Sequence, residues 1–400
     1  MFFWIVLFVL FFILFLINLK LSENTRKILF YIFLLLITCL GIFRNNIGAD
    51  YFAYQKIYFL MDWDSTKIFS IEPTFSILCI LLKKYSFSSQ ALFAIYAILI
   101  NLFIMLGIKY YFPKNYLALN SFLLCWCLYF IGWYNSLTVI RQYLAVAIFF
   151  WSTKFLFEDK FIKYLISILC ATLVHYSSII LILLYPLRKF KIEVKYFIII
   201  LVSFIMLSSQ GIFLNIIIKI VNGLPFTIYK LTFYINDNFH MLHSFVRNNG
   251  TGLGILFYYI FFSSVLIFEN NNSKICEIFI RMIEVGLLIK TIFFMIPPLA
   301  RISIFFEIFG FVAFGYIISS NIKFNDYKEK IKLSFVICMV LGMMIISLYN
   351  INRIPNIQRV HSGHNTNFNI EYKFKCDFFV SIDNRNLDAI NFYIHYCITF

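Results

Sequence analysis

The sequence predicts an all-α integral membrane protein whose helices cross the bilayer about 10–12 times. Of its 400 residues, 62% are hydrophobic and only 13% are charged, about half the charge of a soluble domain. Apolar stretches of roughly 18 or more residues recur along most of the chain, and each can cross a hydrocarbon core ~30 Å thick. Their apolarity is continuous rather than alternating, which selects helices over a β-barrel.

Ten apolar stretches are candidate full-length spans, separated by short polar or basic loops. They are residues 2–19, 28–43, 88–108, 117–133, 137–157, 195–213, 251–268, 278–298, 301–320 and 331–349. The first stretch has neither a basic region before it nor a small-residue cleavage site after it. It is therefore predicted to be a retained span rather than a signal peptide.

The basic loops orient these spans. Lys20, Arg26 and Lys27 place the first loop in the cytoplasm, because short cytoplasmic loops carry an excess of lysine and arginine. Because successive loops lie on alternate sides of the membrane, the loops at 44–87 and 214–250 are predicted to lie outside. Within the first of these, residues 71–87 are short and end in lysines, which is typical of a helix lying in the outer interface. The formal charge of +15 is spread over such loops and indicates no nucleic-acid partner.

Residues 161–187 are apolar throughout but lie between two basic loops. A single crossing would place one of those loops outside, whereas a helical hairpin with its tip near His175 keeps both inside. The sequence therefore predicts a hairpin, either re-entrant or made of two thin spans. A re-entrant hairpin is tolerated only when other helices surround it.

The chain divides into a transmembrane domain, residues 1–349, and a polar, asparagine-rich tail, residues 350–400, placed outside. Six of the nine cysteines lie in apolar runs and none forms a CxxC pair. Small buried apolar residues explain them, so we expect no metal site, no disulfide framework and no cofactor.

The predicted topology collects unusual polar residues on the outer side. They are Arg44 and Asp50 after the second span, Arg141 about one turn into a later span, His175 at the hairpin tip, and Arg301 after a proline pair. Polar groups held against a bilayer are costly and mark a functional site by default.

Each of these residues also has a structural explanation. Arg44 and Arg301 can snorkel to lipid headgroups, and His175 can be a satisfied core histidine. Asp50 can pair with Arg44 or cap the helix that Tyr51 would start. For Arg141 a functional role is favoured over a structural one, because this residue lies past the membrane boundary.

The chemistry suited to this cluster is recognition of a lipid diphosphate. Arg44, Arg141 and Arg301 can bind phosphate oxygens in forked geometry, and Arg141 can also neutralise the charge that develops on a leaving diphosphate. Asp50 or His175 can take a proton from an attacking hydroxyl. Candidate sugar contacts are Tyr51, Tyr54 and Gln142, although an interfacial aromatic belt also explains the tyrosines.

Four stretches resemble the EpsG family of Wzy-like polysaccharide polymerases. They are Arg44–Tyr54 (RNNIGADYFAY), Ile140–Ala145 (IRQYLA), Ala171–Ser178 (ATLVHYSS) and Ala300–Ile302 (ARI). The resemblance covers about residues 28–320. Ala49 departs from it, because threonine is common there, and the tail is longer than the resemblance leads us to expect.

The resemblance implies a membrane glycosyltransferase that joins undecaprenyl-diphosphate-linked oligosaccharide repeat units into O-antigen, capsule or exopolysaccharide. It would be a multi-pass protein of the bacterial inner membrane, surrounded by membrane lipids, with its site facing the periplasm. It would need no metal or nucleotide sugar. A chain-length regulator of the polysaccharide co-polymerase type is a candidate partner.

Two alternatives stay open. An O-antigen ligase would use the same lipid-linked donor with lipid A core as the acceptor. A lipid-linked oligosaccharide flippase or transporter would carry charged residues through the middle of several spans. Such mid-span charges are few in this sequence, so the transporter hypothesis ranks below the polymerase and the ligase.

Overall fold

A computed structural model describes residues 2–48, 50–63, 71–187, 192–222, 253–268, 274–321 and 327–362. These residues are almost all helical and form no β-strand, which confirms the predicted all-α class. The chain divides into two compact units. Unit 1 is Met1–Pro186 with Ile318–Cys397, and unit 2 is Leu187–Ile317 with Ile398–Phe400.

Unit 1 begins with three helices that pack together, α1 (Phe2–Asn18), α2 (Glu23–Ile42) and α7 (Tyr116–Leu128). Ser22 caps α2 by accepting from the amide of Thr25, which satisfies one of the free N–H groups at a helix start. The amide of Asn120 donates to the side chain of Asn18 at 3.0 Å. Polar contacts thus join the buried ends of these helices.

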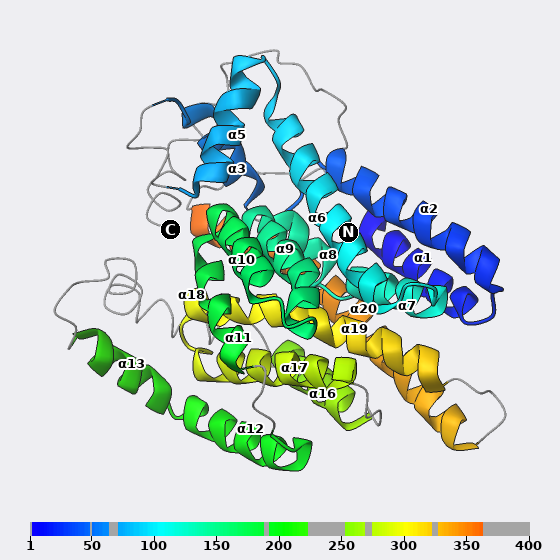
Figure 1. Cartoon of the computed structure of the whole chain (residues 1–400). Coiled ribbons are helices and arrows are strands. Elements are labelled where there is room, and N and C mark those ends of the chain that lie inside the picture. Colours follow the sequence, from blue (N-terminus) through cyan, green and yellow to red (C-terminus); the bar gives the residue numbers. More distant parts are fainter. Residues whose placement is uncertain are drawn as a thin grey trace. The chain divides into compact units, whose positions relative to one another are not determined.

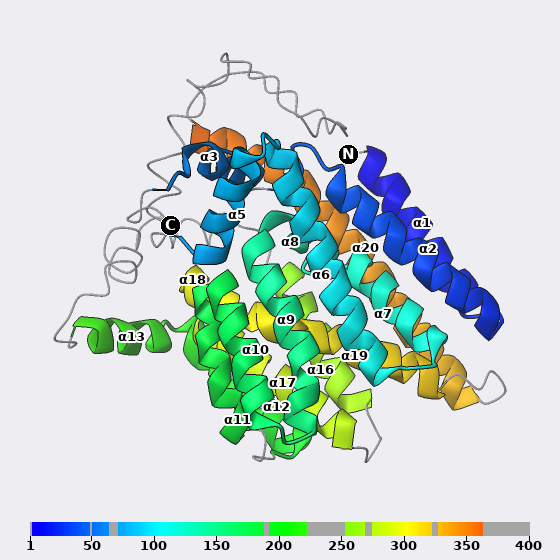
Figure 2. The same cartoon turned by 45° about the horizontal axis from the view of Figure 1, so that its top comes forward.

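Helix α9 (Ile140–Phe157) lies between α6 (Ser89–Tyr111) and α10 (Phe161–Val174), as Figure 2 shows. Gly107 allows the close approach of α6 and α9, because a Cβ there would lie 2.6 Å from the Phe150 ring. These three helices form the centre of unit 1, and the polar site described below lies at one end of them.

The predicted hairpin at 161–187 is present. After α10 the chain turns at His175 and returns through η1 (Tyr176–Leu183) and α11 (Leu184–Leu187). The Tyr164 hydroxyl donates to the carbonyl of Leu181 at 2.6 Å, and the rings of Phe161 and Tyr185 lie 4.6 Å apart. The two arms therefore contact each other along their length.

Two short helices lie beside the first turns of α6 (Figure 1): α3 (Tyr51–Leu60) and α5 (Pro73–Lys84). The predicted helix at 71–87 is α5, and it packs against both α6 and α10. Lys83 donates to the carbonyls of Phe59 and Met61 at 2.9 and 2.6 Å. A cation at these carbonyls complements the negative end of α3.

The remaining helices of unit 1 are α8 (Trp133–Thr138) and α20 (Tyr327–Ser362). The Ser347 hydroxyl of α20 lies 2.8 Å from the carbonyl of Leu128, at the end of α7. Because α20 extends to Ser362, the first residues of the predicted tail are helical. Residues 363–400 lie outside the described part of the chain.

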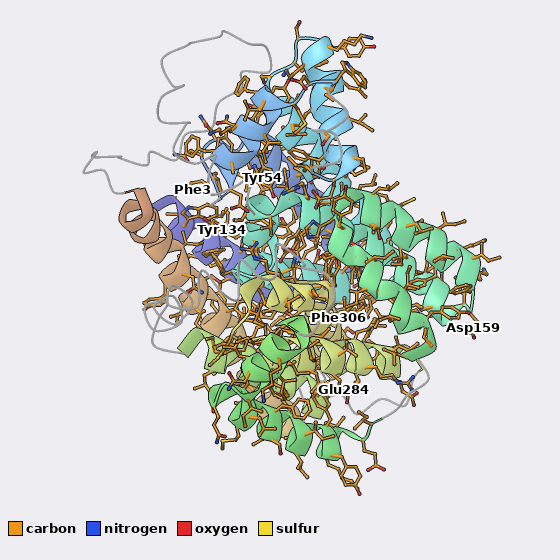
Figure 3. All side chains as sticks on the ribbon, turned by 90° about the vertical axis from the view of Figure 1, so that its left-hand side faces the viewer. Phe3, Tyr54, Tyr134, Asp159, Glu284 and Phe306 are labelled. Carbon is orange, nitrogen blue, oxygen red and sulfur yellow. The ribbon has the colours of Figure 1, made fainter. Side chains whose placement is uncertain are left out.

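Unit 2 contains α12 (Val194–Ser209), α13 (Ile212–Asn222), α16 (Leu253–Phe268), α17 (Lys274–Ile292), α18 (Pro297–Ala300), η3 (Arg301–Ser303) and most of α19 (Ile304–Asn321). Helix α17 contacts α12, α16 and η3. A Cβ on Gly286 of α17 would lie 2.6 Å from Phe306 of α19, which Figure 3 labels. From residue 223 on, the predicted external loop at 214–250 lies outside the described residues.

Within the described residues, four helices are long and apolar enough to cross a membrane. They are Glu23–Ile42, Ser89–Tyr111, Arg301–Ser319 and Ser334–Ile351. A fifth span results if Val194–Ser209 and Ile212–Ile220, which meet at 74°, count as one. Each of the ten predicted spans contains a helix, but several of these are shorter than a full crossing. The chain is a multi-pass membrane protein.

Candidate functional site

Three chain segments in unit 1 bring Glu72, Arg141 and His175 together, and we call these residues the Glu72 cluster. Glu72 directly precedes α5, where Pro73 starts the helix without needing an N–H partner. Arg141 lies in the first turn of α9. His175 follows α10 with φ −154° and ψ 114°, an extended conformation that ends the helix.

Both oxygens of the Glu72 carboxylate are engaged. Oε1 lies 2.7 Å from Nδ1 of His175, and Oε2 accepts a hydrogen bond from Nη1 of Arg141. Glu72 is buried, whereas the side chains of Arg141 and His175 are 22% and 25% exposed. The carboxylate thus lies beneath two groups that stay partly open to a ligand.

Neutral hydrogen bonds also hold the cluster. Thr74 in the first turn of α5 donates to the carbonyl of Leu173 at 2.7 Å, and the Tyr176 hydroxyl donates to the carbonyl of Ile71 at 3.2 Å. These bonds join the start of α5 to the end of α10 on both sides of Glu72 and His175. The arrangement therefore does not depend on charge alone.

Two aromatic side chains also lie close to the Arg141 guanidinium. Its guanidinium carbon lies 5.5 Å from the centre of the Tyr54 ring and 5.3 Å from that of Phe75, within the range of cation–π contacts. Figure 3 labels Tyr54, which is buried. Burial raises the pKa of Tyr54 to about 12, so its hydroxyl stays neutral at neutral pH.

The electrostatics of the cluster keep Glu72 ionised. Burial alone would raise the pKa of this carboxyl, but the hydrogen bond with His175 and the positive charge of Arg141 outweigh it. Together they lower the pKa of Glu72 to about 2.

This ionisation fixes the role of the imidazole. An ionised carboxylate can only accept hydrogen bonds, so Nδ1 of His175 carries the hydrogen of the 2.7 Å contact. In the neutral imidazole, Nε2 is then left as an acceptor, the arrangement in which a carboxylate orients a histidine to act as a base.

Arg44 contacts other residues than the Glu72 cluster does. Its side chain is 1% exposed, and Nη1 donates to the carbonyl of Leu137. Asp50 occupies the position before α3, but its side chain makes no capping hydrogen bond, so the expected capping role is not observed.

The three predicted sugar contacts, Tyr51, Tyr54 and Gln142, are all buried. Tyr176, next to His175, is instead 45% exposed. Arg301 belongs to unit 2, where it is exposed at the start of η3. Of the predicted site residues, the structure therefore brings Arg141 and His175 together on Glu72 and places Tyr54 against Arg141.

Glu72 is the residue that the sequence reasoning missed. The signal that could have found it is charge balance, because an arginine embedded at a membrane boundary needs a nearby carboxylate. Asp50, Asp62 and Glu72 all lie in the same predicted loop. Sequence spacing does not tell which of them reaches Arg141.

The fold and this cluster define a multi-pass helical membrane protein with a charged site at the ends of its helices. The chain matches the EpsG family over residues 27–361 and belongs to that family. The family is associated with glycosyltransferase-like polymerases of polysaccharides. The four resembling stretches all fall within the matched range. No curated protein and no solved structure matches the chain.

Proposed function

We propose that this protein polymerises oligosaccharide repeat units carried on undecaprenyl diphosphate. The observation that carries the proposal is the Glu72 cluster, where one buried carboxylate holds an arginine beside an imidazole. Guanidinium groups suit diphosphates, and a carboxylate-oriented imidazole suits removal of a proton from a hydroxyl. Polymerisation of lipid-linked glycans needs both.

In the proposed reaction, the imidazole and the guanidinium act in the same displacement step. Nε2 of His175 takes the proton of an acceptor sugar hydroxyl, and the hydroxyl oxygen forms a bond to the anomeric carbon of the donor glycan. The bond from that carbon to the diphosphate breaks, and the lipid diphosphate leaves with the electron pair. Arg141 stabilises the negative charge that develops on it.

The glycan then rests on the acceptor's lipid carrier, one repeat longer, and undecaprenyl diphosphate is released. That Arg301 of unit 2 also binds a diphosphate stays a prediction from the sequence. We prefer His175 to Asp50 as the base, because Glu72 orients its imidazole.

The site would face the outside of the cytoplasmic membrane. In three helices the basic residues lie at the opposite end from the site: Arg26 in the first turn of α2, Lys109 in the last turn of α6 and Lys154 in the last turn of α9. Because basic residues favour the cytoplasmic side, this distribution supports an outward-facing Glu72 cluster. Lipid-linked repeats are available there without nucleotide sugars.

The test is Arg141→Ala in a strain that carries no other copy of the gene. We expect the ladder of long glycan chains to collapse to single repeats on the lipid carrier, at normal protein levels. Arg281→Ala is the matched control, because Arg281 is also a helical arginine paired with a glutamate, Glu277 at 3.4 Å. Its ladder should stay long.

Other outcomes point elsewhere. Wild-type chain length in Arg141→Ala would reject the proposal. Polymer that accumulates on undecaprenol without reaching lipid A would indicate a ligase, and single repeats confined to the cytoplasmic face would indicate a transporter.

A further inference from the structure

Arg44 stands in a closed environment that does not suit diphosphate binding. Its guanidinium carbon lies 4.3 Å from the centre of the Phe93 ring, and Nη1 donates to the carbonyl of Leu137. Gln90 donates to the backbone carbonyl of Arg44 at 3.1 Å. The residue is thus fixed through both its side chain and its backbone.

Arg44 also lines a small cavity together with Asn101. Nε and Nη2 have no hydrogen-bond partner within the described chain, and neither has Oδ1 of Asn101 on the same cavity wall. The space open to the centre of a water molecule is about 10 Å³, close to the minimum for one water. A single water can bond Arg44 there, whereas a phosphate group has no room.

Arg44 nevertheless stays charged. Burial lowers its pKa to about 10, although the nearby Asp50 carboxylate opposes that effect. A pKa of about 10 leaves the guanidinium protonated at neutral pH. The charge-assisted bond to Leu137 is therefore present under physiological conditions.

Gly48 contacts the same peptide group from the other end of the loop. Its φ is +98°, and an added Cβ would lie 2.8 Å from the Leu137 carbonyl oxygen and 3.0 Å from Cα of Thr138. Any side chain at this position would be strained by the backbone conformation and would also push against residues 137–138. The loop from Arg44 to Gly48 thus fits only with these two residues in place.

The clamped peptide leads directly into the site. Leu137 and Thr138 end α8, Val139 precedes α9 without a side-chain cap, and Arg141 lies in the first turn of α9. We propose that Arg44 and Gly48 form a clamp on Leu137–Thr138 that positions Arg141 for the diphosphate, and that Arg44 itself touches no substrate. The part of this inference that concerns catalysis rests on the proposed function.

The first test does not depend on activity. Amide hydrogen exchange is measured by mass spectrometry on the purified full-length protein, for peptides covering residues 137–143. We expect Arg44→Met and Gly48→Ala to speed exchange there by about tenfold or more. Gly211→Ala is the control, because Gly211 also has a positive φ, +73°, but no atom within 4 Å of its added Cβ.

The second test is a double-mutant cycle on glycan transfer from a purified lipid-linked repeat. Misplacing a catalytic group by about 1 Å can cost about 10²-fold in rate, so each single variant should lose roughly that much. The double variant should lose no more than the worse single, because both changes break one contact. Arg44→Lys should lose activity as Arg44→Met does, since lysine lacks the planar guanidinium that stacks on Phe93.

Additive losses in the cycle would overturn the clamp, since two independent roles would then be present. Unchanged exchange at 137–143 in both variants would also overturn it. If Arg44→Met folds poorly, hydrogen exchange at residues 137–143 is measured on Arg44→Gln and Gly48→Ala instead. If the wild type transfers no glycan, the proposed function fails, and the exchange experiment still decides the clamp.

Discussion

The two units bury carboxylates of the same type in different surroundings. In unit 1, Glu72 uses both oxygens, one on Arg141 and one on His175 at 2.7 Å. In unit 2, Glu307 is 3% exposed and uses one oxygen, which accepts from the Ser303 hydroxyl at 3.2 Å and lies 3.9 Å from Nζ of Lys290. Its other oxygen has no hydrogen-bond partner among the described residues.

The difference shows that burial alone does not identify a functional carboxylate. Taking an ionised carboxylate out of water costs several kcal/mol, and only close partners on both oxygens offset that cost. Glu72 has such partners and fixes two groups that stay partly exposed. Glu307 has one loose ionic partner and exposes no comparable pair, so we assign it a packing role between α17 and α19.

The largest expected effect comes from removing the paired carboxylate. Glu72→Ala leaves the partly buried Arg141 without its counter-charge, and breaking a buried ion pair lowers the free energy of unfolding by up to about 3–5 kcal/mol. Glycan chains longer than one repeat should also disappear. Unfolding in detergent micelles and glycan gels measure the two effects.

The control for this change is Glu158→Ala, because Glu158 pairs with Lys160 at 2.6 Å on an exposed loop. Exposed pairs contribute little to stability because water screens them, and polymer length should not change. Equal losses of stability in Glu72→Ala and Glu158→Ala would contradict the larger contribution that we assign to the Glu72 contacts.

A smaller effect concerns pH. The pKa of Glu72 is lowered from 4.5 to about 2 in the folded protein, so its ionic contacts stabilise the fold above about pH 4.5 and are lost as pH falls toward 2. The stability difference between wild type and Glu72→Gln should therefore shrink as the pH falls from about 4.5 toward 2. Thermal unfolding at a series of pH values in that range measures it, and a difference that grows as the pH falls through the range would contradict the assignment.

The smallest expected effect is that of Glu307→Gln. The amide keeps a contact to Ser303 and removes a charge that is paired on only one oxygen. We expect the free energy of unfolding to stay level or rise by up to about 1 kcal/mol, with polymer length unchanged. A loss as large as that of Glu72→Ala would show that the two carboxylates are equivalent after all.

The sequence determined the helical membrane class, the hairpin that turns at His175, and the family. Hydropathy and loop charge indicate the first two features, because the bilayer imposes span length and short basic loops favour the cytoplasmic side. Four short stretches of sequence indicate the family. Arg141 was also predictable, since a cation inside an apolar run has few structural explanations.

Only the tertiary structure decided which side chains meet. It selected Glu72 from several carboxylates of one loop, and it buried Arg44 against Phe93 and Leu137, although the sequence predicted that Arg44 and Arg141 both bind phosphate. The physical reason is that ion pairs and clamps depend on the packing of helices α2, α5, α6, α9 and α10 against one another. The apolar residues that direct that packing look alike along the chain, so spacing alone does not specify the contacts between helices.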